Sequence, residues 1–113
     1  MTRLLLVCLG GALGSGARYL TGLAVPHATV VVNLVGSFAI ALVMERIAPS
    51  SELRYFVVTG ILGGFTTYSA FNQETLQWLR AGAAGAALLN LGVTVVGCLA
   101  AGAAGIFVAR ALE

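Results

Sequence analysis

The chain has 113 residues, of which 59% are hydrophobic and only 9% are charged, and its net charge is +2. Soluble domains carry about 25% charged residues because their surface must be hydrated, so this composition excludes a soluble enzyme, a disulfide scaffold and a disordered chain. The six basic residues are arginines scattered along the chain, which argues against a nucleic-acid binder.

Long uncharged stretches predict an all-α membrane protein that forms one domain over residues 1–113. A helix that crosses a bilayer needs about 20 apolar residues, so four such helices and short loops account for the chain. Pro26 separates the first two helices, because proline favours an extended residue before it and a helix start after it. No small-residue cleavage site follows the first apolar stretch, which argues against a signal peptide. We expect the four transmembrane helices at about residues 3–24, 27–46, 54–79 and 82–110.

The first helix carries a small-residue motif and a charge. Gly10 and Gly14 form a G-x-x-x-G motif, and Gly60 and Gly64 form another in the third helix. Small residues let helix backbones approach closely in lipid, so close packing or dimerisation explains these glycines. Arg18 is an ionised group within an apolar run, where such groups usually face protein or water. It either snorkels to the membrane surface or raises the local anion concentration at a pore mouth.

The third helix is predicted to be broken near the bilayer midplane. Two adjacent glycines, Gly63 and Gly64, precede Thr66 and Thr67, and this composition makes a poor continuous helix. Lipid cannot satisfy the backbone groups that a break frees, so a break is tolerated only against protein, water or an ion. Inward carbonyls there can coordinate a hard cation such as Na⁺. The alternative is a glycine-rich packing face, with the threonines bonded back to the preceding turn.

Two aromatic residues follow the predicted break on one helical face. Tyr68 and Phe71 are three residues apart. An aromatic ring is positive at its edge, so it can face a small anion without a buried cation. The alternative is that both are ordinary core aromatics.

Uncharged polar residues recur in the second and fourth helices. The Asn33 carboxamide can donate to an anion or to a neighbouring helix. Asn90, Thr94 and Cys98 recur at intervals of four and form one weakly polar stripe. Such a stripe either lines a path for an anion or forms hydrogen bonds between helices.

Three blocks of the chain resemble the Fluc (CrcB) fluoride-channel family. Gly10–Tyr19 (GGALGSGARY) resembles its G-G-x-x-G-x-x-x-R-[YF], and Thr29–Gly36 (TVVVNLVG) resembles its T-x-x-x-N-x-x-G. Gly60–Phe71 (GILGGFTTYSAF) resembles its highly specific G-x-x-G-G-x-T-T-F-S-T-F, and Glu74 follows where the family also has an acid. Length and the four-helix plan agree, so the resemblance covers the whole chain, although the fourth helix matches only by its polar stripe.

The resemblance implies an antiparallel dimer with two fluoride pores and a central structural Na⁺, held by the backbone carbonyls of Gly63 and Thr66. Arg18 and Glu74 are implied as vestibule or structural residues. The implied pore residues are Asn33, Tyr68, Ser69, Phe71, Asn90, Thr94 and Cys98. Tyr68 departs from the usual phenylalanine, Ala70 from the usual threonine, and Cys98 donates more weakly than the serine often found there.

The expected function is passive export of F⁻ across the cell inner membrane, with no enzymatic activity because no nucleophile–base pair is visible. The rival is an exporter similar to the small multidrug transporters, which are also antiparallel dimers of four short helices. That chemistry usually needs a membrane-embedded acid, whereas Glu45 and Glu74 lie near the expected helix ends. The expected partners are fluoride, the lipid bilayer and a second subunit. An antiparallel homodimer is favoured, and a heterodimer of paralogous subunits is the alternative.

Overall fold

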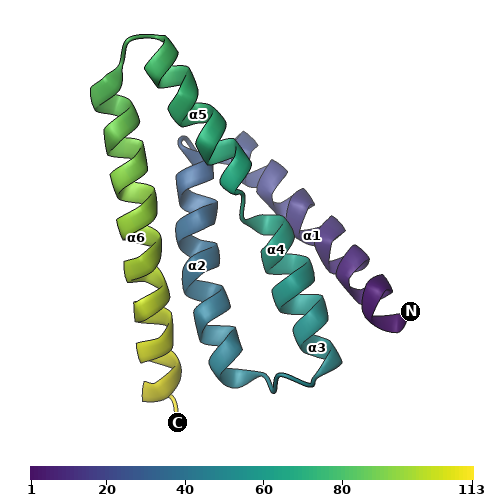
Figure 1. Ribbon diagram of the computed structural model, residues 1–113. Coiled ribbons are helices and arrows are strands. Elements are labelled where there is room, and N and C mark those ends of the chain that lie inside the picture. The colour runs from purple at the N-terminus through teal and green to yellow at the C-terminus, as the bar shows by residue number, and fades with distance from the viewer.

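The computed structural model describes residues 1–113 and is helical throughout, apart from short connections. The order of elements is α1 (Thr2–Ala24), α2 (Ala28–Arg46), α3 (Glu52–Arg54), the π-helical segment η1 (Tyr55–Leu62), α4 (Gly63–Phe65), α5 (Tyr68–Arg80) and α6 (Ala84–Ala111). The segments α3, η1 and α4 run on without interruption and together with α5 form the third helix, which bends between α4 and α5 (Figure 1). The prediction of an all-helical fold with four helices and a bent third helix is therefore confirmed.

Three of these helices, α1, α2 and α6, are long and apolar enough to cross a membrane. The third helix is divided into shorter pieces by its bend. Only 13 of the 113 residues are buried, and the exposed residues include most of the large apolar side chains. A soluble protein rarely exposes such a continuous apolar surface, so these faces are suited to contact with lipid or another subunit.

The connection between α1 and α2 follows from its proline. Val25, the residue before Pro26, is extended with φ −126° and ψ 129°, as the proline ring requires of its predecessor. His27 then adopts the left-handed conformation, with φ 54°, immediately before α2 begins. Both termini and the α2–α3 connection lie at one end of the molecule, and the α5–α6 connection lies at the other (Figure 1).

The two glycine motifs pack against each other. A Cβ atom at Gly14 would fall on the carbonyl of Ile61, and one at Gly60 would lie 2.8 Å from the Cα of Gly10. A Cβ atom at Gly64 would approach the α1 backbone to 2.7 Å. The absence of side chains at these positions therefore allows α1 to cross the third helix in backbone contact. The other main packing pair is α2 with α6.

The π-helical turn of η1 was not predicted. Its wider hydrogen bonding includes the N–H of Gly63, which donates to the carbonyl of Val58. The segment lies against α1 and leads directly into α4 and the bend. Such turns occur mostly as short insertions within α-helices and are frequent at functional sites.

Candidate functional site

The bend of the third helix consists of two extended residues, Thr66 (φ −84°, ψ 155°) and Thr67 (φ −153°, ψ 116°), which we call the break. The Thr66 hydroxyl donates to the carbonyl of Leu62 at 3.1 Å, so it is bonded back to the preceding turn. The Thr67 hydroxyl instead accepts the N–H of Ala70 at 3.2 Å and caps α5. The chain is therefore opened at the break, and threonine side chains secure both of its ends.

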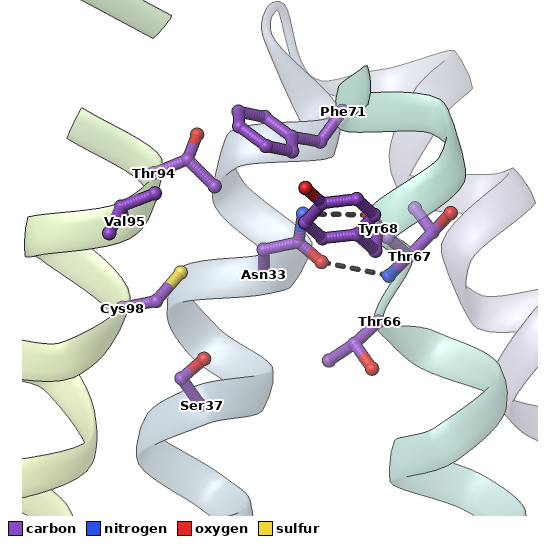
Figure 2. Close-up of a pocket in the computed structure, with 9 residues that line it drawn as sticks. All are labelled: Asn33, Ser37, Thr66, Thr67, Tyr68, Phe71, Thr94, Val95 and Cys98. Carbon is purple, nitrogen blue, oxygen red and sulfur yellow. Dashed lines mark hydrogen bonds between the residues drawn. The ribbon is translucent and has the colours of Figure 1, made fainter. Parts of the chain in front are cut away.

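Asn33 of α2 binds the backbone of the break. Its Oδ1 accepts the N–H of Thr67 at 2.8 Å, and its Nδ2 donates to the carbonyl of Thr67 at 3.0 Å (Figure 2). This pair of hydrogen bonds satisfies both backbone groups of Thr67, which an uninterrupted helix would have satisfied internally. A carboxamide carries two N–H groups, so one donor of Asn33 remains available to another ligand.

The break also leaves carbonyl groups without their helical donors. The Thr67 N–H, which would serve the carbonyl of Gly63 in a continuous helix, is turned toward Asn33. No backbone N–H donates to the carbonyl of Thr66. Freed carbonyl oxygens are the ligands that a hard cation such as Na⁺ prefers, so Gly63 and Thr66 fit the role that the family resemblance implies for them. No cluster of three or more His, Cys, Asp or Glu side chains offers a different metal site.

A cavity of about 280 Å³ opens beside the break, and we call it the break cavity. It is bounded by α2, α6 and the third helix (Figure 2). Its lining contains hydroxyl, carboxamide and thiol groups but no ionised side chain. The lining residues are Asn33, Ser37, Thr66, Thr67, Tyr68, Phe71, Thr94, Val95 and Cys98.

Thr94 differs from the other polar groups of this cavity. It is only 7% exposed, and its Oγ1 has no hydrogen-bond partner. A buried hydroxyl without a partner costs about 1–3 kcal/mol, and native proteins usually avoid that cost by binding water or a ligand. In Figure 2, Thr94 and Phe71 lie toward one end of the cavity and Ser37 toward the other. The unpaired hydroxyl thus favours a polar occupant near Phe71.

The two predicted aromatics both line the break cavity but differ in burial. Phe71 is 2% exposed, whereas Tyr68 is 74% exposed. Their rings meet edge to face, with centroids 5.4 Å apart and planes at 68°. Phe71 therefore belongs to the interior of the subunit, and Tyr68 presents most of its ring to whatever lies outside it.

Asn90 lies outside the break cavity, although it shares a stripe with Thr94 and Cys98. Its Nδ2 donates to the hydroxyl of Thr75 at 2.9 Å, and that hydroxyl donates to the carbonyl of Phe71 at 2.9 Å. Asn90 faces a second, mostly apolar cavity of about 370 Å³. That cavity is lined by His27, Val30, Trp78, Ala86, Leu89, Asn90 and Val93.

The remaining predicted residues surround the cavity without lining it. Ser69 is exposed, and its hydroxyl lies 3.4 Å from that of Thr67. The Glu74 carboxylate accepts a hydrogen bond of 2.6 Å from the Thr29 hydroxyl and so joins α5 to α2. Arg18 is partly buried, and its Nε has no partner.

Ser37 was missed as a candidate site residue. It follows Asn33 by four residues and therefore shares one face of α2 with it, a spacing that could have identified it.

Comparison with known proteins agrees with the family resemblance of the three sequence blocks. Residues 5–106 match the family described as CrcB-like protein, Camphor Resistance (CrcB). The chain is 49% identical to the fluoride-specific ion channel FluC of Anaeromyxobacter dehalogenans, with 97% of each chain covered. It is 44% identical to the FluC protein of Geobacter sp. (99% and 100% covered) and 41% identical to that of Chelativorans sp. (99% of each).

Proposed function

We propose that this chain, which belongs to the CrcB-like family, is a fluoride-specific ion channel. Fluoride enters a cell from acidic surroundings as neutral HF and dissociates inside. The inside-negative membrane potential then drives the anion out through the channel, at roughly 2.3 kcal/mol per charge per 100 mV. Relief of fluoride toxicity at the cell inner membrane therefore requires no nucleotide and no enzymatic step.

The unpaired, buried hydroxyl of Thr94 is the observation that carries this proposal. It is a donor without a protein partner, in the same cavity as the Phe71 ring and the Asn33 carboxamide. A small, strongly hydrogen-bonding anion gains most from such donors when it sheds its water. No arginine lines the cavity, so the anion is not held by an ion pair and can leave again.

The rival exporter reading finds no support in this geometry. Neither cavity is lined by a carboxylate, and such transport usually depends on a membrane-embedded acid. Glu74 is already hydrogen-bonded to Thr29, and Glu45 is exposed near the end of α2.

We propose further that the functional unit is an antiparallel homodimer with a central Na⁺. The large exposed apolar surface and the outward-facing ring of Tyr68 support a second subunit. The free carbonyl of Thr66 and the displaced donor of Gly63 support the cation site. When bound, Na⁺ would be held by those carbonyls and would supply positive charge at the break. A heterodimer of paralogous subunits is the alternative.

The arginines give a measurement that separates these assemblies. Four of them, at positions 3, 46, 54 and 110, belong to the ends of α1, α2, α3 and α6 that lie with both termini, whereas Arg80 ends α5 beside the α5–α6 connection. Short-loop arginines favour the cytoplasm, so this bias opposes dual insertion of one chain. The homodimer proposal holds if Arg3 and Arg110, at the two ends of the chain, count for less than the loop arginines. A cysteine placed at Ser50, in a chain with Cys8 and Cys98 replaced, should react from both sides of cells that express this chain alone. Reaction from the cytoplasmic side only would mean that a partner of opposite orientation is required.

The conduction mechanism is tested by the electrical dependence of flux. Liposomes that contain the purified protein are loaded with potassium fluoride and diluted into fluoride-free buffer. A passive channel releases fluoride rapidly only after valinomycin lets K⁺ leave with it, and an imposed proton gradient changes nothing. Absence of valinomycin-dependent fluoride release from folded protein would overturn the proposal, and transport of a cationic drug driven by the proton gradient would favour the rival.

A further inference from the structure

We propose that Cys98 is a modification site within the ion path, at which a small thiol-reactive electrophile reversibly blocks fluoride flux. The inference rests on the proposed channel function, because it takes the break cavity as part of the conduction pathway. Cys98 is a free, partly exposed cysteine of α6 that lines this cavity. The other cysteine, Cys8, lies on the exposed surface of α1 and lines none of the cavities.

The position of Cys98 places any adduct within the cavity. The preceding residue, Gly97, lies so close to α2 that an added Cβ atom would be 2.9 Å from Leu34. The Leu34 side chain therefore fills the space between α6 and α2 beside Gly97. Figure 2 shows the Cys98 sulfur directed toward the interior of the cavity, between Thr94 and Ser37. An added group has to occupy the space between those hydroxyls.

A second observation favours the binding of polar molecules in this cavity. The Thr94 hydroxyl is 93% buried and unpartnered, one helical turn from Cys98 in the same cavity. The cavity of about 280 Å³ is wide enough to hold water, and Asn33, Ser37 and three threonines offer it hydrogen-bonding groups. A small reagent that travels through water, as the anion does, therefore reaches the thiol by the same route.

The chemistry is ordinary thiol exchange. With methyl methanethiosulfonate as the probe, Cys98 loses its proton to water and the thiolate attacks the sulfenyl sulfur. A new S–S bond forms, the bond from that sulfur to the sulfonyl group breaks, and methanesulfinate leaves. The S–H donor is replaced by a methylated disulfide that fills part of the path, and dithiothreitol reverses the reaction by a second exchange.

The decisive protein is the Cys8→Ser variant, in which Cys98 is the only thiol. Its valinomycin-dependent fluoride flux is measured before reagent, after reagent and after dithiothreitol, while mass spectrometry measures the adduct. We expect loss of most of the flux with one adduct, and recovery with the reductant. Undiminished flux with a complete adduct, or no adduct at all, would overturn this inference and leave the channel function standing. Absence of flux before treatment would overturn both.

The matched control is Cys98→Ser, in which Cys8 is the only thiol. Its flux after treatment is compared with its own untreated flux, so its basal rate does not enter the comparison. We expect the reagent to leave that ratio unchanged even when Cys8 is modified. A block that persists in Cys98→Ser, or one that vanishes in Cys8→Ser, would assign the effect to another site.

Discussion

The side chains of Asn33 and Thr94 line one cavity but are held in opposite ways. Asn33 makes two hydrogen bonds to the backbone of Thr67, so it maintains the break as well as offering one free N–H. Thr94 makes no hydrogen bond to the protein. One residue therefore stabilises the site, whereas the other is destabilising until something binds it.

This difference predicts that Thr94→Val separates flux from stability. Valine keeps the shape of threonine and removes the unpaired hydroxyl, so fluoride flux should fall while the free energy of unfolding stays unchanged or rises. Liposome flux and thermal unfolding in detergent measure the two effects. The comparison variant is Asn33→Leu, which strands two backbone groups of Thr67 and should lower stability by about 1–3 kcal/mol for each group. Equal destabilisation by both variants would contradict this assignment.

Phe71 is predicted to act through its ring edge as well as its bulk. Phe71→Ile keeps an apolar side chain in the same 2% exposed position, so the dimer should survive in detergent while fluoride flux is nearly abolished. Size-exclusion chromatography and liposome flux provide the measurements. Phe38→Ile is the control, because Phe38 lines none of the cavities and its replacement should leave flux intact. Loss of the dimer together with flux would mean that Phe71 serves packing alone.

At the scale of the elements, the crossing of α1 over the third helix depends on glycine. Gly14→Ala places a methyl group on the carbonyl of Ile61, so the helices must separate, and we expect a loss of about 1–3 kcal/mol in stability. The control is Gly22→Ala, in the same helix, where an added Cβ atom has nothing within 4 Å. Thermal unfolding of the two variants should differ clearly. Equal melting temperatures would show that the close crossing is not needed.

The elements themselves were largely predictable from local chemistry. Uncharged stretches indicated the helices, and the Gly63-Gly64 and Thr66-Thr67 pairs indicated the bend. The two interpretations of the bend were a broken helix and a continuous packing face with threonines bonded back to the preceding turn. Each holds in part, because the helix opens at the break while the Thr66 hydroxyl donates to the carbonyl of Leu62.

What could not be predicted depends on the register between helices. Asn33 meets Thr67 across 34 residues of sequence, and Asn90 falls in a different cavity from Thr94. These levels are set by close contacts: Gly36 of α2 lies against the Thr66 side chain, and Gly105 of α6 lies against the carbonyl of Phe38. Spacing within one helix gives the face on which a residue lies, but it does not give the level at which another helix meets that face.

At the scale of the whole molecule, the proposed Na⁺ site links the break to assembly. Replacement of Na⁺ by a large organic cation should lower the thermal stability of the dimer and reduce flux, because the carbonyls of Gly63 and Thr66 lose the cation that they coordinate. Differential scanning fluorimetry and liposome flux follow the change, and restored Na⁺ should reverse it. Stability and flux that are both indifferent to exhaustive removal of Na⁺ would show that the site is wrongly assigned.

The central claim is that the uncharged, hydrogen-bonding cavity beside the break conducts fluoride selectively. The most direct test compares anion efflux from paired liposomes, one set loaded with potassium fluoride and the other with potassium chloride, at equal protein density and with valinomycin present. We predict rapid, complete release of fluoride from every liposome that contains a channel, and chloride release no faster than from protein-free liposomes. Chloride release as rapid as that of fluoride would contradict the claim.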